Sequence, residues 1–253
     1  MMGVSWLESE LLHPFRHGFF ARRGGHSSGV CTSLNCGFRL YDSETNVRAN
    51  RRLVARHIGV EVGNLLVPHQ RHTSRVQFLS ESSGFEPDNT DGLVTNRKGL
   101  AVAVLTADCL PLLLADRENM VIAAVHAGWR GMKAGIIENA VRSMELAGAQ
   151  RKSTNAVIGP AISQANYEVG AEVVDMFLSA IPDCEGHFRI NPRNRFDFDL
   201  TGLGLELLKR SGVGCRERMS RCTYDDERNC FSCRRSHHRG ESGFGVMISA
   251  ISM

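Results

Sequence analysis

The sequence has no long apolar run and no apolar N-terminal segment. None of its apolar stretches approaches the roughly 18 residues that a membrane-spanning helix needs. The first ten residues are too polar for a signal peptide. These two absences predict a soluble, cytoplasmic protein that does not contact a membrane.

The sequence also has little net charge. Thirty Lys and Arg residues against 27 Asp and Glu residues give a net charge of +3. No basic run of the kind that forms a nucleic-acid surface is present. We therefore expect a small-molecule substrate and no nucleic acid. We also expect a monomer or weak homodimer, although the sequence does not determine the oligomeric state.

Linkers, low-complexity tracts and internal repeats are missing as well, and 42% of the 253 residues are hydrophobic. This composition predicts one domain over residues 1–253, with a large buried core. The eight cysteines are not preceded by a secretion signal, so they are interpreted as thiols or metal ligands rather than disulfides.

Short apolar runs rich in Leu and β-branched residues predict buried strands at residues 101–105, 112–115 and 121–125. Cys109 and His126 lie at the ends of two adjacent runs. Polar residues at the ends of buried strands lie where the core opens to solvent. We therefore expect Asp108, Cys109, His126, Trp129 and Arg130 to converge on one rim.

Cys109 and His126 are too far apart in sequence for a zinc knuckle, so a shared metal requires a ligand from another element. The best candidate is His72 in the strand-like run 67–76, where Gln70 and His72 are expected on one face. Two imidazoles and one thiolate suit Zn²⁺ and leave a fourth position for water or substrate. Residue type alone leaves a second interpretation open, because such Cys and His residues often only pack or bind solvent.

Longer motifs bear on this choice, and they extend from about residue 17 to residue 235. They are Gln70-x-His72, Thr106-Ala107-Asp108-Cys109-Leu110-Pro111, His126-Ala127-Gly128-Trp129-Arg130-Gly131, Ile158-Gly159-Pro160-Ala161-Ile162, Tyr167-Glu168-Val169-Gly170, Ser33-Leu34-Asn35, Cys222-Thr223, and Phe231-Ser232 followed by Arg234-Arg235. With these motifs the sequence closely resembles the bacterial laccase-domain family, also called the YfiH-like or polyphenol oxidase family. Its members are now mostly assigned as purine nucleoside phosphorylases.

The resemblance implies that His72, Cys109 and His126 bind one zinc ion per chain, because they match the zinc ligands of the family's motifs. It also implies phosphorolysis of adenosine, inosine and S-methyl-5'-thioadenosine, together with adenosine deamination. The implied fold is α+β, a single domain of mixed β-sheets packed together and flanked by helices. The order of predicted elements agrees, since strands first cluster and then alternate with helices near residues 43–58, 131–147, 171–180 and 200–211.

Other residues receive roles around this site. Asp108 is the nearest candidate for proton transfer. Arg130 and the N-terminus of a helix over residues 131–147 are expected to bind phosphate. The resemblance places the region of Arg22 and Asn35 at the same cleft, with Arg22 or Arg23 for phosphate and Asn35 for a sugar or base.

The sequence departs from the family's pattern near its end. Cys230 and Cys233 replace aromatic residues around the late Phe-Ser pair, and a terminal Gly-Arg is missing, although Arg239 lies nearby. Together with Cys222, these cysteines form a spacing that either binds a second, structural zinc or simply packs.

Three alternative functions are considered. The first is a cysteine- or zinc-dependent amide hydrolase that edits peptidoglycan precursors by removing L-serine from UDP-MurNAc-L-Ser, with Cys109 as nucleophile and His126 as base. The second is a copper polyphenol oxidase (laccase). It is less favoured because none of the ten histidines forms a His-x-His pair. A single site of two histidines and one cysteine would nevertheless bind Cu²⁺ in vitro. The third is a nucleotide-sensing or partner-binding module, which predicts metal without turnover.

Overall fold

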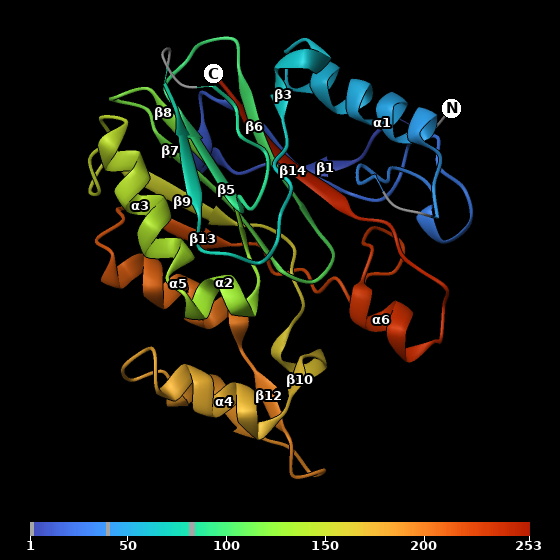
Figure 1. The fold of residues 1–253 in the computed structure, drawn as a ribbon, viewed down its shortest axis with the longest axis vertical. Helices are drawn as coiled ribbons and strands as arrows, with labels where there is room; N and C mark the ends of the chain where they lie inside the picture. Colours follow the sequence, from blue (N-terminus) through green and yellow to red (C-terminus); the bar gives the residue numbers. More distant parts are fainter. Residues whose placement is uncertain (1–2, 39–40, 81–83) are drawn as a thin grey trace.

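Two mixed sheets packed face to face form the centre of the computed structural model, which describes residues 3–38, 41–80 and 84–253 (Figure 1). The five-stranded sheet has the order β1 (Trp6–Leu7), β2 (Arg16–Phe20), β14 (Met247–Ser252), β6 (Ala101–Thr106), β3 (Leu65–Leu66). The six-stranded sheet has the order β13 (Arg216–Arg218), β9 (Thr154–Ile158), β7 (Leu110–Asp116), β8 (Val121–Ala127), β5 (Gly92–Thr95), β4 (Val76–Leu79). Both sheets combine parallel and antiparallel pairs.

The central strands are apolar along their whole length because both of their faces are covered. In β7, Leu112 and Leu114 face the core beneath the helices, whereas Leu113 and Ala115 face the core between the two sheets. Successive side chains of a strand point to opposite faces, so one continuous apolar run fills both cores. The predicted strands at residues 101–105, 112–115 and 121–125 all lie within observed strands.

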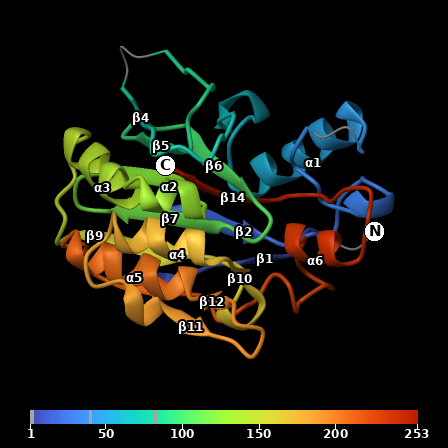
Figure 2. The same ribbon diagram turned by 60° about the horizontal axis from the view of Figure 1, so that its bottom comes forward.

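Helices cover the outer faces of both sheets (Figures 1 and 2). On the five-stranded sheet, α1 (Glu44–His57) buries Val54 and Ala55, and its N-terminus is capped by Ser43 as predicted. On the six-stranded sheet lie α3 (Ile136–Leu146) and α5 (Leu200–Arg210), the latter capped by Asp199. The fold class predicted from the sequence is therefore confirmed.

A smaller sheet extends the molecule at one end, at the bottom of Figure 1. Its strands pack against helix α4 (Ala171–Leu178) through Phe177, whose ring makes edge contacts with the stacked rings of Phe188 and Phe198. Its order is β10 (Glu168–Val169), β12 (Phe196–Phe198), β11 (Phe188–Ile190). The remaining α-helices among the described residues are α2 (Trp129–Lys133) and α6 (Cys233–His238).

Two predicted elements are wrong. The run 67–76 is not a strand, because β3 ends at Leu66, β4 begins at Val76, and His72 has a left-handed backbone with φ of 60°. The helix predicted over residues 131–147 is two helices, α2 and α3. Gly135 separates them, with a φ of 85° that an L-residue rarely adopts.

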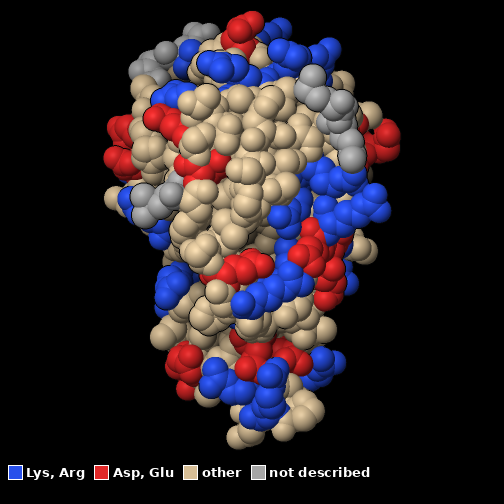
Figure 3. Space-filling view, turned by 90° about the vertical axis from the view of Figure 1, so that its right-hand side faces the viewer, with Lys and Arg blue, Asp and Glu red and all other residues tan. Residues whose placement is uncertain are grey.

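The distribution of charged side chains on the surface is consistent with the small net charge. Figure 3 shows an uncharged area on the upper half of one face, with positive and negative side chains beside one another below it. In the part of the chain that the structure describes, no helix is long and apolar enough to cross a membrane.

Candidate metal centre

Four segments meet at one edge of the six-stranded sheet. Cys109 directly precedes β7, and His126 lies at the end of β8, paired in register with Pro111. Strand β5 runs antiparallel to β8, so Asp91, immediately before β5, lies beside His126. Strand β4 is parallel to β5, which brings the preceding segment with His72 to the same edge. Strand pairing therefore assembles the site from distant parts of the sequence.

The structure brings His72, Cys109 and His126 together. One ligand atom from each residue lies within 4.8 Å of the others, and Cys109 Sγ is 3.9 Å from His72 Nε2. Ligand atoms around a tetrahedral zinc ion lie about 3.3–3.8 Å apart, given zinc–ligand bonds of about 2.0–2.3 Å. The cluster therefore fits zinc after a small contraction, with His126 buried and His72 exposed on the open side.

Asp91 is the buried residue that holds two of these ligands in place, and sequence reasoning missed its role. Its carboxylate accepts a hydrogen bond from His126 Nδ1 at 2.8 Å and another from the His72 backbone N–H at 3.0 Å. It also accepts hydrogen bonds from Thr73 and the Arg71 backbone. Since Nδ1–H of His126 donates to Asp91, Nε2 remains for a metal.

The charges in the cluster support one another. Burial raises the pKa of the Cys109 thiol, but the charge of His126 and hydrogen bonds from both histidines lower it to about 6. Burial lowers the pKa of His126, whereas the Cys109 thiolate and Asp91 raise it to about 9. Burial raises the pKa of Asp91, but hydrogen bonds from His126 and Thr73 lower it to about 2. Cys109 is therefore a thiolate near neutral pH, the form that binds metal.

Gly128 allows the close approach of two ligands. A Cβ atom at this position would lie 2.7 Å from His72 Cδ2 and 3.1 Å from Cys109 Sγ. The first separation is shorter than real Cβ contacts, so any larger residue would displace the His72 ring. This contact explains why the segment after His126 requires glycine.

Gln70 fixes the segment that carries His72. Its side-chain amide donates to the Leu105 carbonyl at 2.7 Å and accepts from the Leu105 N–H at 2.8 Å. The amide therefore takes the place of a neighbouring strand along β6. With Asp91 on the other side, these bonds hold His72 in its left-handed conformation, which an isolated strand does not supply.

Asp108 lies next to Cys109, but its carboxylate points to another part of the chain. One oxygen accepts from the Thr223 hydroxyl at 2.6 Å and the other from the Arg234 N–H at 2.7 Å. Its φ of 91° is strained for a non-glycine residue. These contacts anchor the Cys109 turn to the C-terminal region, and proton transfer by Asp108 stays a prediction.

A cleft of about 530 Å³ opens from the cluster towards α1. Its lining includes the three ligands, Phe38 and Arg51 from the α1 region, and Arg71, Cys233 and Phe244. Phe38 is 50% exposed, and the Arg51 guanidinium lies 4.7 Å from the centre of its ring. Arg51 also donates to the Cys36 carbonyl. The sequence pattern gave no signal for Phe38 or Arg51.

Arg130 does not line this cleft. Its guanidinium lies 4.2 Å from the centre of the Trp129 ring, on the exposed side of the short helix α2. Phosphate binding by Arg130 stays a prediction, and the expected long helix behind it is absent, because α2 ends at Lys133.

Arg22 and Asn35 are also outside the lining of this cleft. Arg22 donates to the carbonyls of Thr32 and Glu227 and lies over the Phe231 ring. Asn35 is fully buried, and its amide bonds Asp42, Gly37 and the Val246 N–H. Both residues hold loops together in this structure, and direct substrate contact by either one stays a prediction.

The three late cysteines are not brought together as a ligand set. Cys222 accepts hydrogen bonds from Ser163 and Asn166, Cys230 is buried, and Cys233 lines the metal cleft. Within residues 3–38, 41–80 and 84–253, one group of three or more His, Cys, Asp or Glu side chains is placed to hold a metal ion. This group is His72, Cys109 and His126.

The fold and site define a single-domain α+β protein in which two histidines and one cysteine are placed where they could hold a metal ion in an open cleft. The model of the family described as multi-copper polyphenol oxidoreductase laccase matches residues 16–253, and the chain belongs to that family. The resemblance found in the sequence is thereby confirmed.

Relatives of known sequence and structure agree. The purine nucleoside phosphorylase of Corynebacterium glutamicum is 35% identical over 237 residues, which are 93% of this chain and 95% of that protein. That of Deinococcus radiodurans is 35% identical, with coverage of 90% and 85%. YlmD from Geobacillus stearothermophilus superposes with a TM-score of 0.88 at 27% identity, covering 99% of this chain and 96% of that one. A Neisseria meningitidis protein gives 0.87 at 32% identity, with coverage of 100% and 99%.

Proposed function

We propose that this protein is a zinc-dependent enzyme that carries out phosphorolysis of adenosine, inosine and S-methyl-5'-thioadenosine and also deaminates adenosine. The observation that carries the proposal is the cluster of His72, Cys109 and His126 at the base of a cleft of about 530 Å³. This volume lies within the range of about 300–1,000 Å³ that is usual for small-molecule sites. The names of the relatives support the phosphorylase part.

In phosphorolysis, a phosphate oxygen forms a bond to C1' of the ribose, the bond from C1' to the purine nitrogen breaks, and the base leaves with a proton. Zinc held by the three ligands would supply a positive charge that polarises a bound group. Asp91 keeps the His126 ring oriented, and the exposed Phe38 offers an aromatic contact for the purine. The reaction needs a cation for phosphate as well.

Arg51 and Arg71 are the arginines that line the cleft, so we assign phosphate binding to this pair. In the described part of the chain, no carboxylate lies within ion-pair distance of either guanidinium. A guanidinium without a carboxylate partner keeps its charge and donors for a phosphate. Deamination requires no phosphate, so the two reactions depend differently on these residues.

A nucleoside panel tests the proposal. Adenosine, inosine and S-methyl-5'-thioadenosine are incubated with zinc-quantified protein, with and without phosphate, and free base, ribose 1-phosphate and ammonia are measured. We expect the release of free base to require phosphate. Of the three nucleosides, only adenosine should release ammonia, and it should do so both with and without phosphate. No phosphate-dependent base release from any of the three nucleosides would refute the phosphorylase proposal.

The low pKa of Cys109 favours the amide hydrolase as a second candidate, since a thiolate beside imidazoles is also a nucleophile. Iodoacetamide separates the two functions. A zinc-bound thiolate is protected until a chelator removes the metal, whereas a free nucleophile is alkylated in the untreated protein. Release of L-serine from UDP-MurNAc-L-Ser, lost on such alkylation, would support the hydrolase. The description of the family as a laccase agrees with the copper oxidase alternative, but the described residues provide one metal cluster rather than the several that a multicopper site needs.

A further inference from the structure

The turn that carries Cys109 has an unfavourable backbone conformation. It joins the end of β6 at Thr106 to the start of β7 at Leu110, and Asp108 within it has a φ of 91°. A non-glycine residue keeps such a conformation only where the surrounding structure imposes it. Cys109 directly follows Asp108, so the contacts that fix Asp108 also fix the candidate ligand.

Three hydrogen bonds hold Asp108 from outside the turn. The Thr223 hydroxyl donates to carboxylate Oδ1 at 2.6 Å, and the Arg234 backbone N–H donates to Oδ2 at 2.7 Å. The Ile162 N–H donates to the Asp108 carbonyl at 3.0 Å. Asp108 is 8% exposed and does not line the metal cleft, although its neighbour Cys109 does. The Asp108 carboxylate therefore serves as an anchor for the turn.

Arg235 in turn holds Thr223. Both residues are buried, and the Arg235 guanidinium donates to the carbonyls of Thr223, Tyr224 and Cys230 at 2.6, 2.9 and 2.6 Å. Charged donors in a fixed planar group form strong, directed hydrogen bonds. Arg235 lies in α6, so these bonds fasten the segment 221–230 to the same helix whose first turn supplies the Arg234 N–H. The two groups that bind the Asp108 carboxylate are therefore held together by one buried guanidinium.

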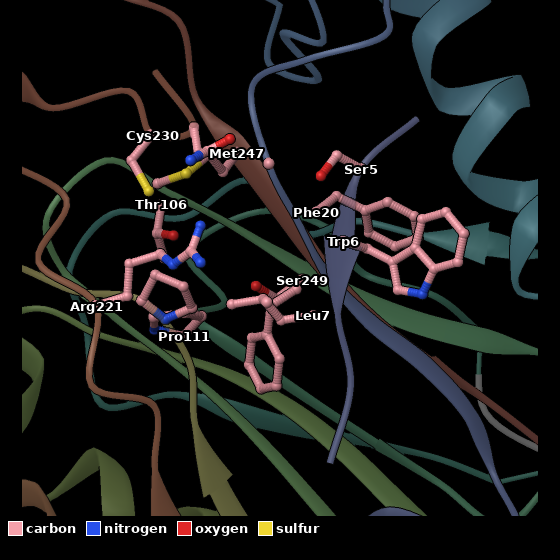
Figure 4. Close-up of a pocket in the computed structure, with 14 residues that line it drawn as sticks. Ser5, Trp6, Leu7, Phe20, Thr106, Pro111, Arg221, Cys230, Met247 and Ser249 are labelled. Carbon is pink, nitrogen blue, oxygen red and sulfur yellow. The ribbon is translucent and has the colours of Figure 1, made fainter. Parts of the chain in front are cut away.

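Apolar packing does not hold the segment 221–230 along its whole length. A cavity of about 200 Å³ lies beside it, and Arg221 and Cys230 line this cavity together with Thr106 and Pro111 from the two strands that flank the turn (Figure 4). Atoms next to a void lack contacts on that side. Directed hydrogen bonds, rather than close packing, therefore fix the position of the segment against the Cys109 turn.

We propose that Thr223 and Arg235 are positioning residues for Cys109 and act through Asp108. Thr223 is 115 positions from Asp108 in the sequence and does not line the cleft, so it acts on a bound metal only indirectly. Loss of its hydroxyl leaves one Asp108 oxygen without its donor and frees the turn to leave its strained conformation. The inference rests on the proposed zinc site, and it makes the metal affinity of that site depend on the C-terminal part of the chain.

Co²⁺ binding tests the inference without relying on enzyme activity. Chelator-stripped protein is titrated with Co²⁺, and the charge-transfer absorption of a cobalt-bound thiolate reports the bond to Cys109. Cys109→Ala should lack this absorption. Its presence in Cys109→Ala, or its absence from the wild type, would refute the metal site itself, and the inference with it.

Thr223→Val nearly keeps the side-chain volume but removes the hydroxyl, and we expect it to weaken Co²⁺ binding about tenfold. Thr223→Ser keeps a hydroxyl and should retain most of the affinity. Thr154→Val is the matched control, because the buried Thr154 hydroxyl donates to the Gln150 carbonyl, and Thr154 pairs with Asp116 at the opposite end of β7 from Cys109. It should lower the melting temperature as Thr223→Val does and leave the Co²⁺ affinity unchanged.

Asp108→Asn tests the path of the effect, because it changes the anchor without altering the segment 221–230. It should weaken Co²⁺ binding as well, since the amide cannot accept both hydrogen bonds that the carboxylate accepts. If Thr223 acts through Asp108, adding Thr223→Val to Asp108→Asn should have little further effect. The inference is overturned by an unchanged Co²⁺ affinity in Thr223→Val, by an equal loss of affinity in Thr154→Val, or by effects of the two substitutions that multiply in the double variant.

Discussion

The Asp91 carboxylate accepts a hydrogen bond from His126 Nδ1 at 2.8 Å, and the same oxygen accepts the His72 N–H at 3.0 Å. One buried side chain therefore sets the ring orientation of one candidate ligand and the backbone position of another. Both ligands and Asp91 come from separate segments, so the site depends on the pairing of β4, β5 and β8.

We predict that Asp91→Asn weakens zinc binding by about 10- to 100-fold, because the amide cannot accept every hydrogen bond that the carboxylate accepts. The same change should lower the free energy of unfolding by about 1–3 kcal/mol, since buried backbone N–H groups lose their partner. Zinc affinity by competition with a chelator and urea unfolding measure the two effects. Asp88→Asn is the matched control, because Asp88 pairs with the exposed His69. Equal zinc affinity in both variants would contradict the role of Asp91.

Gly128→Ala should displace the His72 ring and reduce the zinc content of purified protein. The reason is steric, because the new Cβ would lie 2.7 Å from His72 Cδ2. Gly63→Ala serves as control, since no atom lies within 4 Å of a Cβ at that position. Elemental analysis measures the zinc content of both purified variants. Full zinc occupancy in Gly128→Ala would show that the His72 ring is not held as close to position 128 as it is in this structure.

Arg51→Gln should raise the KM for phosphate in phosphorolysis by about tenfold while changing adenosine deamination much less. Arg51 lines the same cleft as the three ligands, whereas Arg130 does not. Arg130→Gln is therefore measured beside it, with the KM for phosphate as the readout. A larger effect of Arg130→Gln would return phosphate binding to the residue that the sequence motif indicated.

His17 should make stability fall in weak acid. It is buried, Nδ1–H donates to the Phe15 carbonyl, and Nε2 accepts the Ser9 N–H, so the neutral ring is required. Burial lowers the pKa of His17 from 6.5. Below pH 6.5 the unfolded chain therefore binds more protons than the folded chain. The stability that the neutral His17 ring contributes is complete above pH 6.5 and is lost as the pH falls towards the folded-state pKa.

Urea unfolding at a series of pH values below and above 6.5 tests this prediction. His17→Gln should be less stable than the wild type but should lose less stability on acidification. His13→Gln removes a half-exposed imidazole nearby and should keep the wild-type slope. If the free energy of unfolding of His17→Gln falls with pH as steeply as that of the wild type, the acid sensitivity comes from another group.

The elements that the sequence predicted correctly are those specified by local signals. Ser43 caps α1 as its residue type indicates, and the apolar runs around Cys109 and His126 form strands because each run fills two cores. The motifs also indicated which three residues would meet. The fold class and the composition of the cluster were therefore accessible before any coordinates.

The features that were missed depend on contacts between distant residues. The segment with His72 has strand-like periodicity, but Gln70 binds Leu105 and Asp91 binds the backbone N–H groups of residues 71–73, which imposes a turn. Phe38 and Arg51 reach the cleft only because α1 packs against the outer face of the five-stranded sheet. The spacing of residues within one segment does not predict contacts with distant segments.

The most direct test of the central claim is the rate of inosine phosphorolysis as zinc is titrated into chelator-stripped protein. The three-ligand site predicts that the rate rises from near zero and saturates at one zinc ion per chain. Cys109→Ala, folded by circular dichroism, should show no such rise. A full rate in stripped protein, or a normal titration in Cys109→Ala, would contradict the assignment of His72, Cys109 and His126 as a catalytic zinc site.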